Sequence, residues 1–198
     1  MLRWGKLEVA WGFPVLAAVV LLAGAGEVLP AAVLSALGHE AGHLLALRLA
    51  GARVERVRLT AFGAEILADT RFLPYPREIL CTLAGPAVNL LLAVVLARLT
   101  GACLAAGVNL TLGAFNLLPV PALDGGRVLH LLVSWGWGPL AADRVCRWIG
   151  LSCALALTAA ALAVTIRYHA GLFLLMGAAG TLLPQIPVPV RAQRAGRK

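Results

Sequence analysis

The sequence predicts an all-α membrane protein with about six transmembrane helices and a short interfacial β-hairpin between helices two and three. Hydrophobic residues make up 61% of the 198 positions and charged residues only 13%, and the mean hydropathy is +0.88. These values are typical of integral membrane proteins and exclude an ordinary soluble domain. We therefore expect one polytopic domain over residues 1–198.

Six apolar segments divide the chain, and spans of about 20 residues leave room for only short connections. They run roughly over Val9–Ala25, Ala31–Leu49, Ile79–Ala97, Ala105–Val133, Ile149–Ile166 and Ala170–Leu183. The fourth is long and is interrupted by proline and glycine. Arg3 and Lys6 precede the first segment and Ala23-Gly24-Ala25 ends it, so a cleaved signal sequence is an alternative there. Its removal would leave the topology of the other segments unchanged.

The formal net charge of +8 follows membrane topology. If both termini are cytoplasmic, 15 of the 17 basic residues lie on the cytoplasmic side, and only Arg98 and Arg167 lie outside. This distribution agrees with the positive-inside rule for a multi-pass protein. The basic residues are not clustered with aromatic residues on a polar face, so no nucleic-acid partner is expected. The basic tail from Pro184 to Lys198 instead suits the anionic surface of a lipid bilayer.

The second apolar segment contains His39-Glu40-Ala41-Gly42-His43. On a helix this pattern places two imidazoles one turn apart on one face, where both can bind a single Zn²⁺. Glu40 can then act as general base toward a water molecule at the metal. Ionisable side chains within a membrane span are costly and indicate function. A buried polar cluster without metal is the alternative.

Asp124 is the only other acid within the six segments. Segments two and four run in the same direction across the membrane, so we expect Asp124 at a depth comparable to that of His39 and His43. Two histidines and one carboxylate, with a fourth position left for water, are the ligand set of a catalytic zinc site. Pro119 and Pro121 interrupt the helix before Asp124, which would let the carboxylate reach the metal and open a wet pocket. A simple kink is the alternative.

Two further motifs follow His-Glu-Ala-Gly-His: Ala84-Gly85-Pro86-Ala87-Val88-Asn89, and a run from Asn116 through Leu123-Asp124-Gly125-Gly126. In this order they resemble the site-2 protease family of intramembrane zinc metalloproteases, peptidase family M50, over a core of about residues 31–133. The combination of H-E-x-x-H with N-x-x-P-x-x-x-L-D-G is highly specific. The compact form, without a PDZ insertion, is similar to the stage IV sporulation protein FB subgroup. That subgroup typically adds a C-terminal CBS domain, which we do not expect here.

The resemblance implies three ligands for one zinc ion per chain: His39, His43 and Asp124. It also implies that Glu40 activates water and later protonates the leaving amine. Asn116 would bind the substrate backbone or the developing oxyanion. Asn89, Pro119 and Pro121 would give structural support. An interhelical hydrogen bond that only holds the bundle together is the alternative for either asparagine.

The implied reaction is hydrolysis of a peptide bond in or near a membrane segment of a protein substrate, with release of a cytoplasmic product. By resemblance to the sporulation subgroup, the expected substrate is a membrane-tethered sigma-factor precursor. We expect the protein in a bacterial cell membrane, where an inhibitory membrane protein is a possible partner. The alternative is a non-catalytic metal-binding membrane protein, such as a transporter or metal sensor. A transporter should show internal repeats and paired broken helices. The sequence shows neither, and a transporter has no need of Glu40 beside the ligands.

Between Val54 and Asp69 the helical pattern lapses, and residues 56–60 alternate as in a strand. We predict a short amphipathic hairpin whose exposed edge can capture an unwound substrate peptide by β-addition. A hairpin that only links two spans is the alternative. We expect four cysteines to be free thiols: Cys81, Cys103, Cys146 and Cys153. We expect four other side chains to lie at the membrane interface: His130, His169, Trp135 and Trp137.

Overall fold

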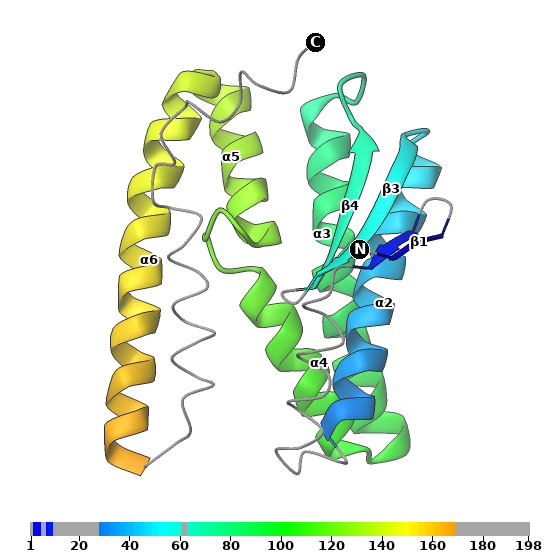
Figure 1. Ribbon diagram of the computed structural model, residues 1–198, viewed down its shortest axis with the longest axis vertical. Helices are drawn as coiled ribbons and strands as arrows, with labels where there is room; N and C mark the ends of the chain where they lie inside the picture. Colours follow the sequence, from blue (N-terminus) through cyan, green and yellow to red (C-terminus); the bar gives the residue numbers. More distant parts are fainter. Residues whose placement is uncertain (1, 5–6, 10–27, 61–62, 169–198) are drawn as a thin grey trace. The chain divides into compact units, whose positions relative to one another are not determined.

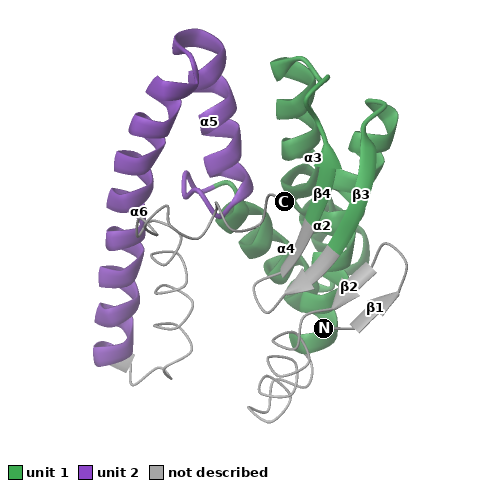
Figure 2. Ribbon diagram, turned by 45° about the horizontal axis from the view of Figure 1, so that its top comes forward, with its two compact units in different colours: residues 1–117 green, residues 118–198 purple. Residues whose placement is uncertain are grey.

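The computed structural model describes residues 2–4, 7–9, 28–60 and 63–168 (Figure 1). The predicted segment Ala170–Leu183, nearly all of Val9–Ala25, and His169 lie outside the described residues. The chain is mostly helical with a short β-sheet, and it forms two compact units, residues 1–117 and 118–198 (Figure 2).

The first unit combines a small sheet with three helices. Its described elements are β1 (Leu2–Trp4), β2 (Leu7–Val9), α2 (Val28–Leu49), β3 (Arg53–Thr60), β4 (Gly63–Asp69), α3 (Tyr75–Val95), which continues as the π-helical turn η1 (Leu96–Thr100), and α4 (Cys103–Asn116). Pro74 precedes α3 in an extended conformation, and Pro76 lies in its first turn, where a missing N–H costs no helical hydrogen bond.

The sheet confirms the predicted hairpin and extends it. β3 and β4 pair antiparallel, from Arg53 opposite Asp69 to Thr60 opposite Gly63, with one irregularity between Val54 and Arg56. β2 pairs parallel with β3, and β1 pairs antiparallel with β2, so the strand order is β1-β2-β3-β4. The sequence did not predict strands β1 and β2.

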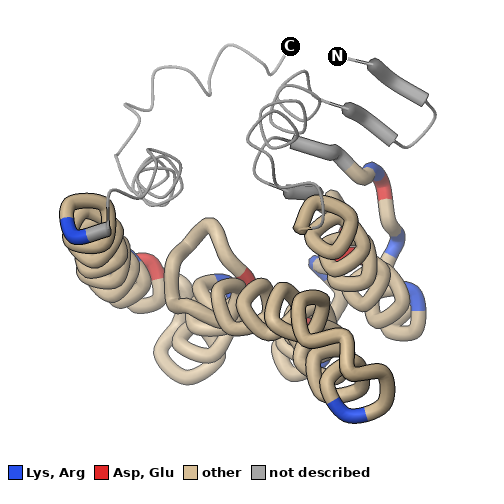
Figure 3. Tube along the Cα trace, turned by 90° about the horizontal axis from the view of Figure 1, so that it is seen from below, with Lys and Arg blue, Asp and Glu red and all other residues tan. Residues whose placement is uncertain are grey.

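The helices of the first unit pack small and polar residues inward. Nearly all of the buried positions on α2, α3 and α4 are small or polar: Ser35, His39 and Gly42; Cys81, Thr82, Gly85, Pro86, Asn89 and Ala93; Ala106, Asn109 and Gly113. Large apolar side chains face outward instead, including Leu34 at 68% exposure and Leu91 at 64%. This distribution is expected for helices that pack against one another in lipid, where small residues allow close backbone approach. Charged residues are few along the described helices (Figure 3).

Two helices of the described residues are long and apolar enough to cross a membrane: Tyr75–Thr100 and Pro139–Arg167. α2 has 22 residues, but the polar side chains of H-E-x-x-H interrupt its apolar run. The prediction of six spans therefore stays a prediction, and membrane insertion is supported by these two helices and by the outward-facing leucines.

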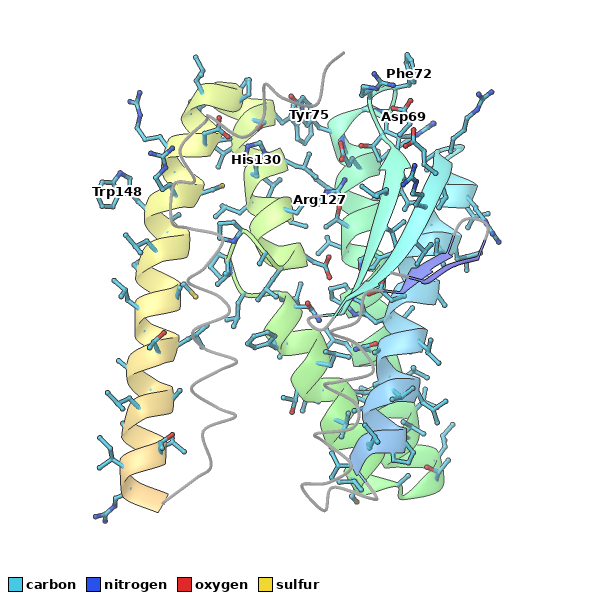
Figure 4. The ribbon with its side chains drawn as sticks, viewed as in Figure 1. Asp69, Phe72, Tyr75, Arg127, His130 and Trp148 are labelled. Atoms are coloured by element: carbon cyan, nitrogen blue, oxygen red, sulfur yellow. The ribbon has the colours of Figure 1, made fainter. Side chains whose placement is uncertain are left out.

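The second unit contains the helices α5 (Asp124–Trp137) and α6 (Pro139–Tyr168). The chain reverses between them at Gly138, whose φ of 85° lies in the left-handed region that glycine adopts without strain. His130 lies on α5 (Figure 4). Its Nε2 lies 2.9 Å from Oδ1 of Asp143 on α6, so this side-chain pair joins the two helices. α6 begins ten residues before the predicted segment Ile149–Ile166.

The predicted fourth segment, Ala105–Val133, is not one span. α4 ends at Asn116, a loop follows, and α5 begins at Asp124. Pro119 and Pro121 explain the break, because each lacks a backbone N–H and its ring clashes with the preceding helical turn. Each of the resulting helices has 14 residues, which is short of the length of about 20 that a single crossing needs.

Candidate metal centre

α2 brings the two histidines of H-E-x-x-H together. His39 is 5% exposed and His43 is half-buried one turn later on the same helix. Their Nε2 atoms lie 3.1 Å apart, and the rings meet edge to face at a centroid distance of 4.7 Å. Two nitrogen ligands of a tetrahedral zinc ion, each at about 2.0–2.1 Å, are about 3.3–3.4 Å apart. The two Nε2 atoms therefore have nearly the separation that two ligands of one zinc ion require.

The second ring nitrogen of His43 has a backbone partner. His43 Nδ1 lies 2.9 Å from the carbonyl oxygen of Cys81 on α3. A carbonyl can only accept, so Nδ1 carries the hydrogen and donates it, which leaves the lone pair of Nε2 available to a metal. Histidine ligands in metal sites are commonly oriented by such a bond. The sequence did not predict the role of this carbonyl.

Two glycines let α3 approach α2 at the histidines. A Cβ added at Gly42 would lie 2.8 Å from the carbonyl oxygen of Ala84, and one added at Gly85 would collide with the His43 imidazole. Either side chain would push the helices apart at the level of the candidate ligands. The signal for this role was present in the sequence, because Gly85 belongs to the Ala84-Gly85-Pro86 motif, but the motif does not say which side chain the glycine accommodates.

The other predicted site residues lie as follows. Glu40 follows His39 on α2 and is half-buried. Asn116 is the last residue of α4, and its side-chain amide donates to the carbonyl oxygen of Leu112 at 3.1 Å. Asn89 is fully buried on α3. Asp124 is the first residue of α5 and belongs to the second unit, whereas the histidines belong to the first.

The loop before Asp124 is fixed by contacts within the second unit. Pro119 and Pro121 flank Val120, which is fully buried. A Cβ added at Gly126 would collide with the carbonyl of Val120, so the loop folds back directly onto the first turn of α5. Position 126 therefore requires glycine, because any side chain there would prevent the loop from folding back and α5 from beginning at Asp124.

Asp69 ends the hairpin (Figure 4) and forms an ion pair with Arg71. Arg71 donates from Nε and Nη2 to the two carboxylate oxygens of Asp69, each at 2.9 Å. These hydrogen bonds lower the pKa of Asp69 from 3.8 to about 2, so this carboxylate is ionised at neutral pH. Phe72, in the same turn, is 89% exposed. An arginine beside an exposed aromatic residue suits a position at the membrane interface.

Three kinds of comparison relate the chain to known proteins. Residues 102–157 match the family model described as peptidase family M50. Zinc metalloprotease MJ0392 of Methanocaldococcus jannaschii is 31% identical over 128 residues, which cover 59% of this chain and 37% of that protein. Putative zinc metalloprotease Rip3 of Mycobacterium tuberculosis is 35% identical over 133 residues, covering 60% of this chain and 33% of that protein. These matches support the peptidase M50 family, the site-2 proteases.

The fold agrees with the sequence matches. The solved site-2 protease from Methanocaldococcus jannaschii superposes with a TM-score of 0.70 at 21% identity, over 93% of this chain and 92% of that one. At this identity the likeness shows the site-2 protease fold. The chain spans about a third of the length of the curated relatives that it matches.

Proposed function

We propose that the chain is a zinc-dependent intramembrane protease of the site-2 protease family, which hydrolyses a peptide bond in or near a membrane segment of a protein substrate. The observation that carries this proposal is the pair of Nε2 atoms 3.1 Å apart, with the His43 ring oriented by the Cys81 carbonyl. Both relatives reported above are named as zinc metalloproteases, Rip3 as a putative one, which favours this function over a non-catalytic transporter or metal sensor. The experiment that tests it compares cleavage by the wild type and by Glu40→Gln.

We propose that His39, His43 and Asp124 hold one zinc ion. The fit rests on the donor set, two imidazoles and one carboxylate, and on the spacing and tautomer of the histidines. Zinc, when bound there, polarises the scissile carbonyl and makes water more acidic. Glu40 accepts the proton of the attacking water and delivers it to the leaving amide nitrogen. Asn116 has a second amide hydrogen beyond the one given to Leu112, and this can bind the substrate carbonyl.

Gly85→Ala is expected to lower zinc affinity without changing any proposed ligand. The added methyl group would displace the His43 ring from its bond to Cys81. Loss of a bond that orients a metal ligand typically lowers metal affinity by about 10- to 100-fold. Competition with a chelator of known affinity would measure the change. Gly107→Ala is the matched control, since a Cβ there on α4 meets no atom within 4 Å. Equal zinc affinity in both variants would contradict the positioning role of Gly85.

The substrate is proposed to enter as an extended strand along β4. β4 stands at the edge of the described sheet, with β3 on its other side. A helical substrate has its peptide groups hydrogen-bonded and must unwind before water can attack. An edge strand can hold the unwound backbone through main-chain hydrogen bonds. The alternative is a hairpin that only connects α2 to α3.

A pair of proline variants separates these two roles of β4. Successive residues of an edge strand direct their N–H groups alternately toward the partner strand and away from it. Of Ile66→Pro and Leu67→Pro, one therefore breaks the ladder with β3 and the other removes only an outward-facing donor. We expect the outward variant to keep the wild-type melting temperature and to raise KM for a membrane-segment substrate. An unchanged KM in that variant would contradict substrate binding along β4 and favour a hairpin that only connects α2 to α3.

The finer substrate assignment rests on the compact form of the chain, which is similar to the stage IV sporulation protein FB subgroup. We propose a membrane-tethered sigma-factor precursor as substrate, with an inhibitory membrane partner as a further component. Co-expression with candidate precursors, scored for release of a cytoplasmic product, distinguishes this substrate from other membrane proteins. Cleavage of a different tethered protein, with no cleavage of the precursors, would support the proposed protease activity and contradict the proposed substrate.

We also propose a multi-pass topology in a bacterial cell membrane with both termini in the cytoplasm, supported by the arginine distribution. Single cysteines at Phe72 and Leu140 test it, because these side chains are 89% and 81% exposed. In a cysteine-free background of intact cells, both are expected to resist a membrane-impermeant thiol reagent and to react after permeabilisation. Labelling of either site from outside would reverse the proposed orientation.

A further inference from the structure

Each of the three helices of the first unit carries at least one deeply buried polar side chain that the proposed reaction does not use. Ser35 on α2 is 1% exposed, Asn89 on α3 is 0% exposed, and Asn109 on α4 is 4% exposed. Asn109 Nδ2 donates to the carbonyl oxygen of Ala105 at 2.9 Å. Among the described residues, four atoms of these side chains have no hydrogen-bond partner: Ser35 Oγ, Asn89 Nδ2, Asn89 Oδ1 and Asn109 Oδ1.

The helix contacts place these three side chains near one level. An added Cβ at Gly38 would lie 3.3 Å from Leu92, whereas one at Gly42 would lie 2.8 Å from Ala84, so α2 and α3 run antiparallel past each other. His39 then lies near the level of Asn89, and Ser35 lies about one turn further along α2.

α4 contributes its polar side chain at the same depth. A Cβ added at Gly113 would lie 3.2 Å from Asn89 Cβ and 3.3 Å from the carbonyl oxygen of Pro86. Asn109 is one turn before Gly113 on the same buried face of α4. Because α4 also runs antiparallel to α3, Asn109 lies slightly beyond Asn89, on the Ser35 side. The four unbonded atoms thus fall within about one helical turn of depth, between three helices that pack against one another.

Direct hydrogen bonds between the helices do not account for these residues. A side chain that only joins two helices must bond across the interface, and none of the four atoms does so. A buried polar group without a partner is destabilising, and hydrocarbon around the helices offers it neither a donor nor an acceptor. A bound water molecule needs two to four polar partners, and these three side chains supply four donor and acceptor atoms near this depth.

We propose that Ser35, Asn89 and Asn109 form a hydrated site inside the first unit, which holds ordered water next to the level of His39. Two acceptors from the asparagines, one amide donor and one hydroxyl can bind one or two water molecules. The use of this water in peptide hydrolysis rests on the proposed function, since each hydrolytic turnover consumes one water molecule within the membrane. The hydration itself does not depend on catalysis.

Water-edited solid-state NMR of the zinc-loaded full chain in lipid vesicles tests the hydration directly. Polarisation starts on water protons, and its arrival at the side-chain nitrogens of Asn89 and Asn109 is followed with time. We expect transfer at the rate of exposed side chains such as Arg71. The backbone amides of Ala93 and Ala106 are the controls, because they lie about one turn away on the same buried faces. Transfer to both asparagines as slow as to these controls would overturn the site.

Asn89→Leu tests whether the water is shared. This variant removes two of the four polar atoms while nearly conserving volume, and we expect loss of the rapid transfer to Asn109. Rapid transfer that persists at Asn109 would overturn a shared site. We also expect a lower kcat with zinc content unchanged. Because the NMR measurement needs no turnover, an inactive wild-type protein would overturn the proposed function while leaving the hydrated site supported by its own result.

Discussion

Replacing Glu40 by glutamine is expected to stop peptide hydrolysis while leaving zinc in place. Glutamine keeps the size of the side chain but cannot accept the proton of the attacking water. Loss of a general base typically lowers the rate by about 10²- to 10⁴-fold. The decrease should appear in kcat rather than in KM, measured on a single-span substrate in lipid vesicles. Glu55→Gln is the matched control, because Glu55 is an exposed acid on β3 outside the proposed site.

The Glu40 variant separates catalysis from metal binding. If Glu40→Gln cleaves at the rate of the Glu55 control, Glu40 is not the base. If Glu40→Gln loses zinc together with activity, the glutamate is a ligand, and the proposed division between three ligands and one base is wrong.

The second large effect is expected at the proposed ligands. His39→Ala combined with His43→Ala should reduce bound zinc from about one ion per chain to none detectable, because a lone carboxylate does not hold zinc tightly. Asp124→Ala should weaken binding while the two histidines remain. Metal analysis of the purified proteins measures both effects.

The chain provides controls of the same residue types. His130→Ala removes the side-chain pair that joins α5 to α6 at 2.9 Å, Asp143→Asn removes its negative charge, and neither residue is a proposed ligand. Both variants should retain about one zinc ion per chain. Full zinc occupancy after loss of His39 and His43, or zinc loss in the His130 variant, would contradict the assigned ligand set.

Much of the fold could be predicted because its signals are local. The alternation at residues 56–60 and the turn residues near Gly63 predicted the hairpin, which the register of β3 and β4 confirms. β1 and β2 were missed because each has three residues, too few to show a period. Pro119 and Pro121 indicated an interruption in the fourth segment. They did not show that α5 would begin at Asp124, which depends on Val120 folding back against Gly126.

The site shows the same division between local and tertiary information. The spacing of His39 and His43 predicted that their rings would share a face, and the structure places them together. The bond from His43 to Cys81 could not be predicted, because a backbone carbonyl carries no signal in the residue type. For Asn89 the sequence suggested a brace between helices. That role stays a prediction. The absence of a direct hydrogen-bond partner for its amide among the described residues is visible only in the packed structure.

Zinc-dependent cleavage by the purified chain in lipid vesicles tests the proposed function most directly. The wild type is stripped of metal with a chelator, mixed with a single-span substrate, and assayed before and after stoichiometric zinc is restored. If the chain is a zinc-dependent protease, we expect no product without zinc, a new cytoplasmic fragment after zinc is added, and no fragment from Glu40→Gln under either condition. Cleavage by the metal-free wild type, or a zinc-loaded wild type that binds the substrate and never cleaves it, would contradict the proposed function.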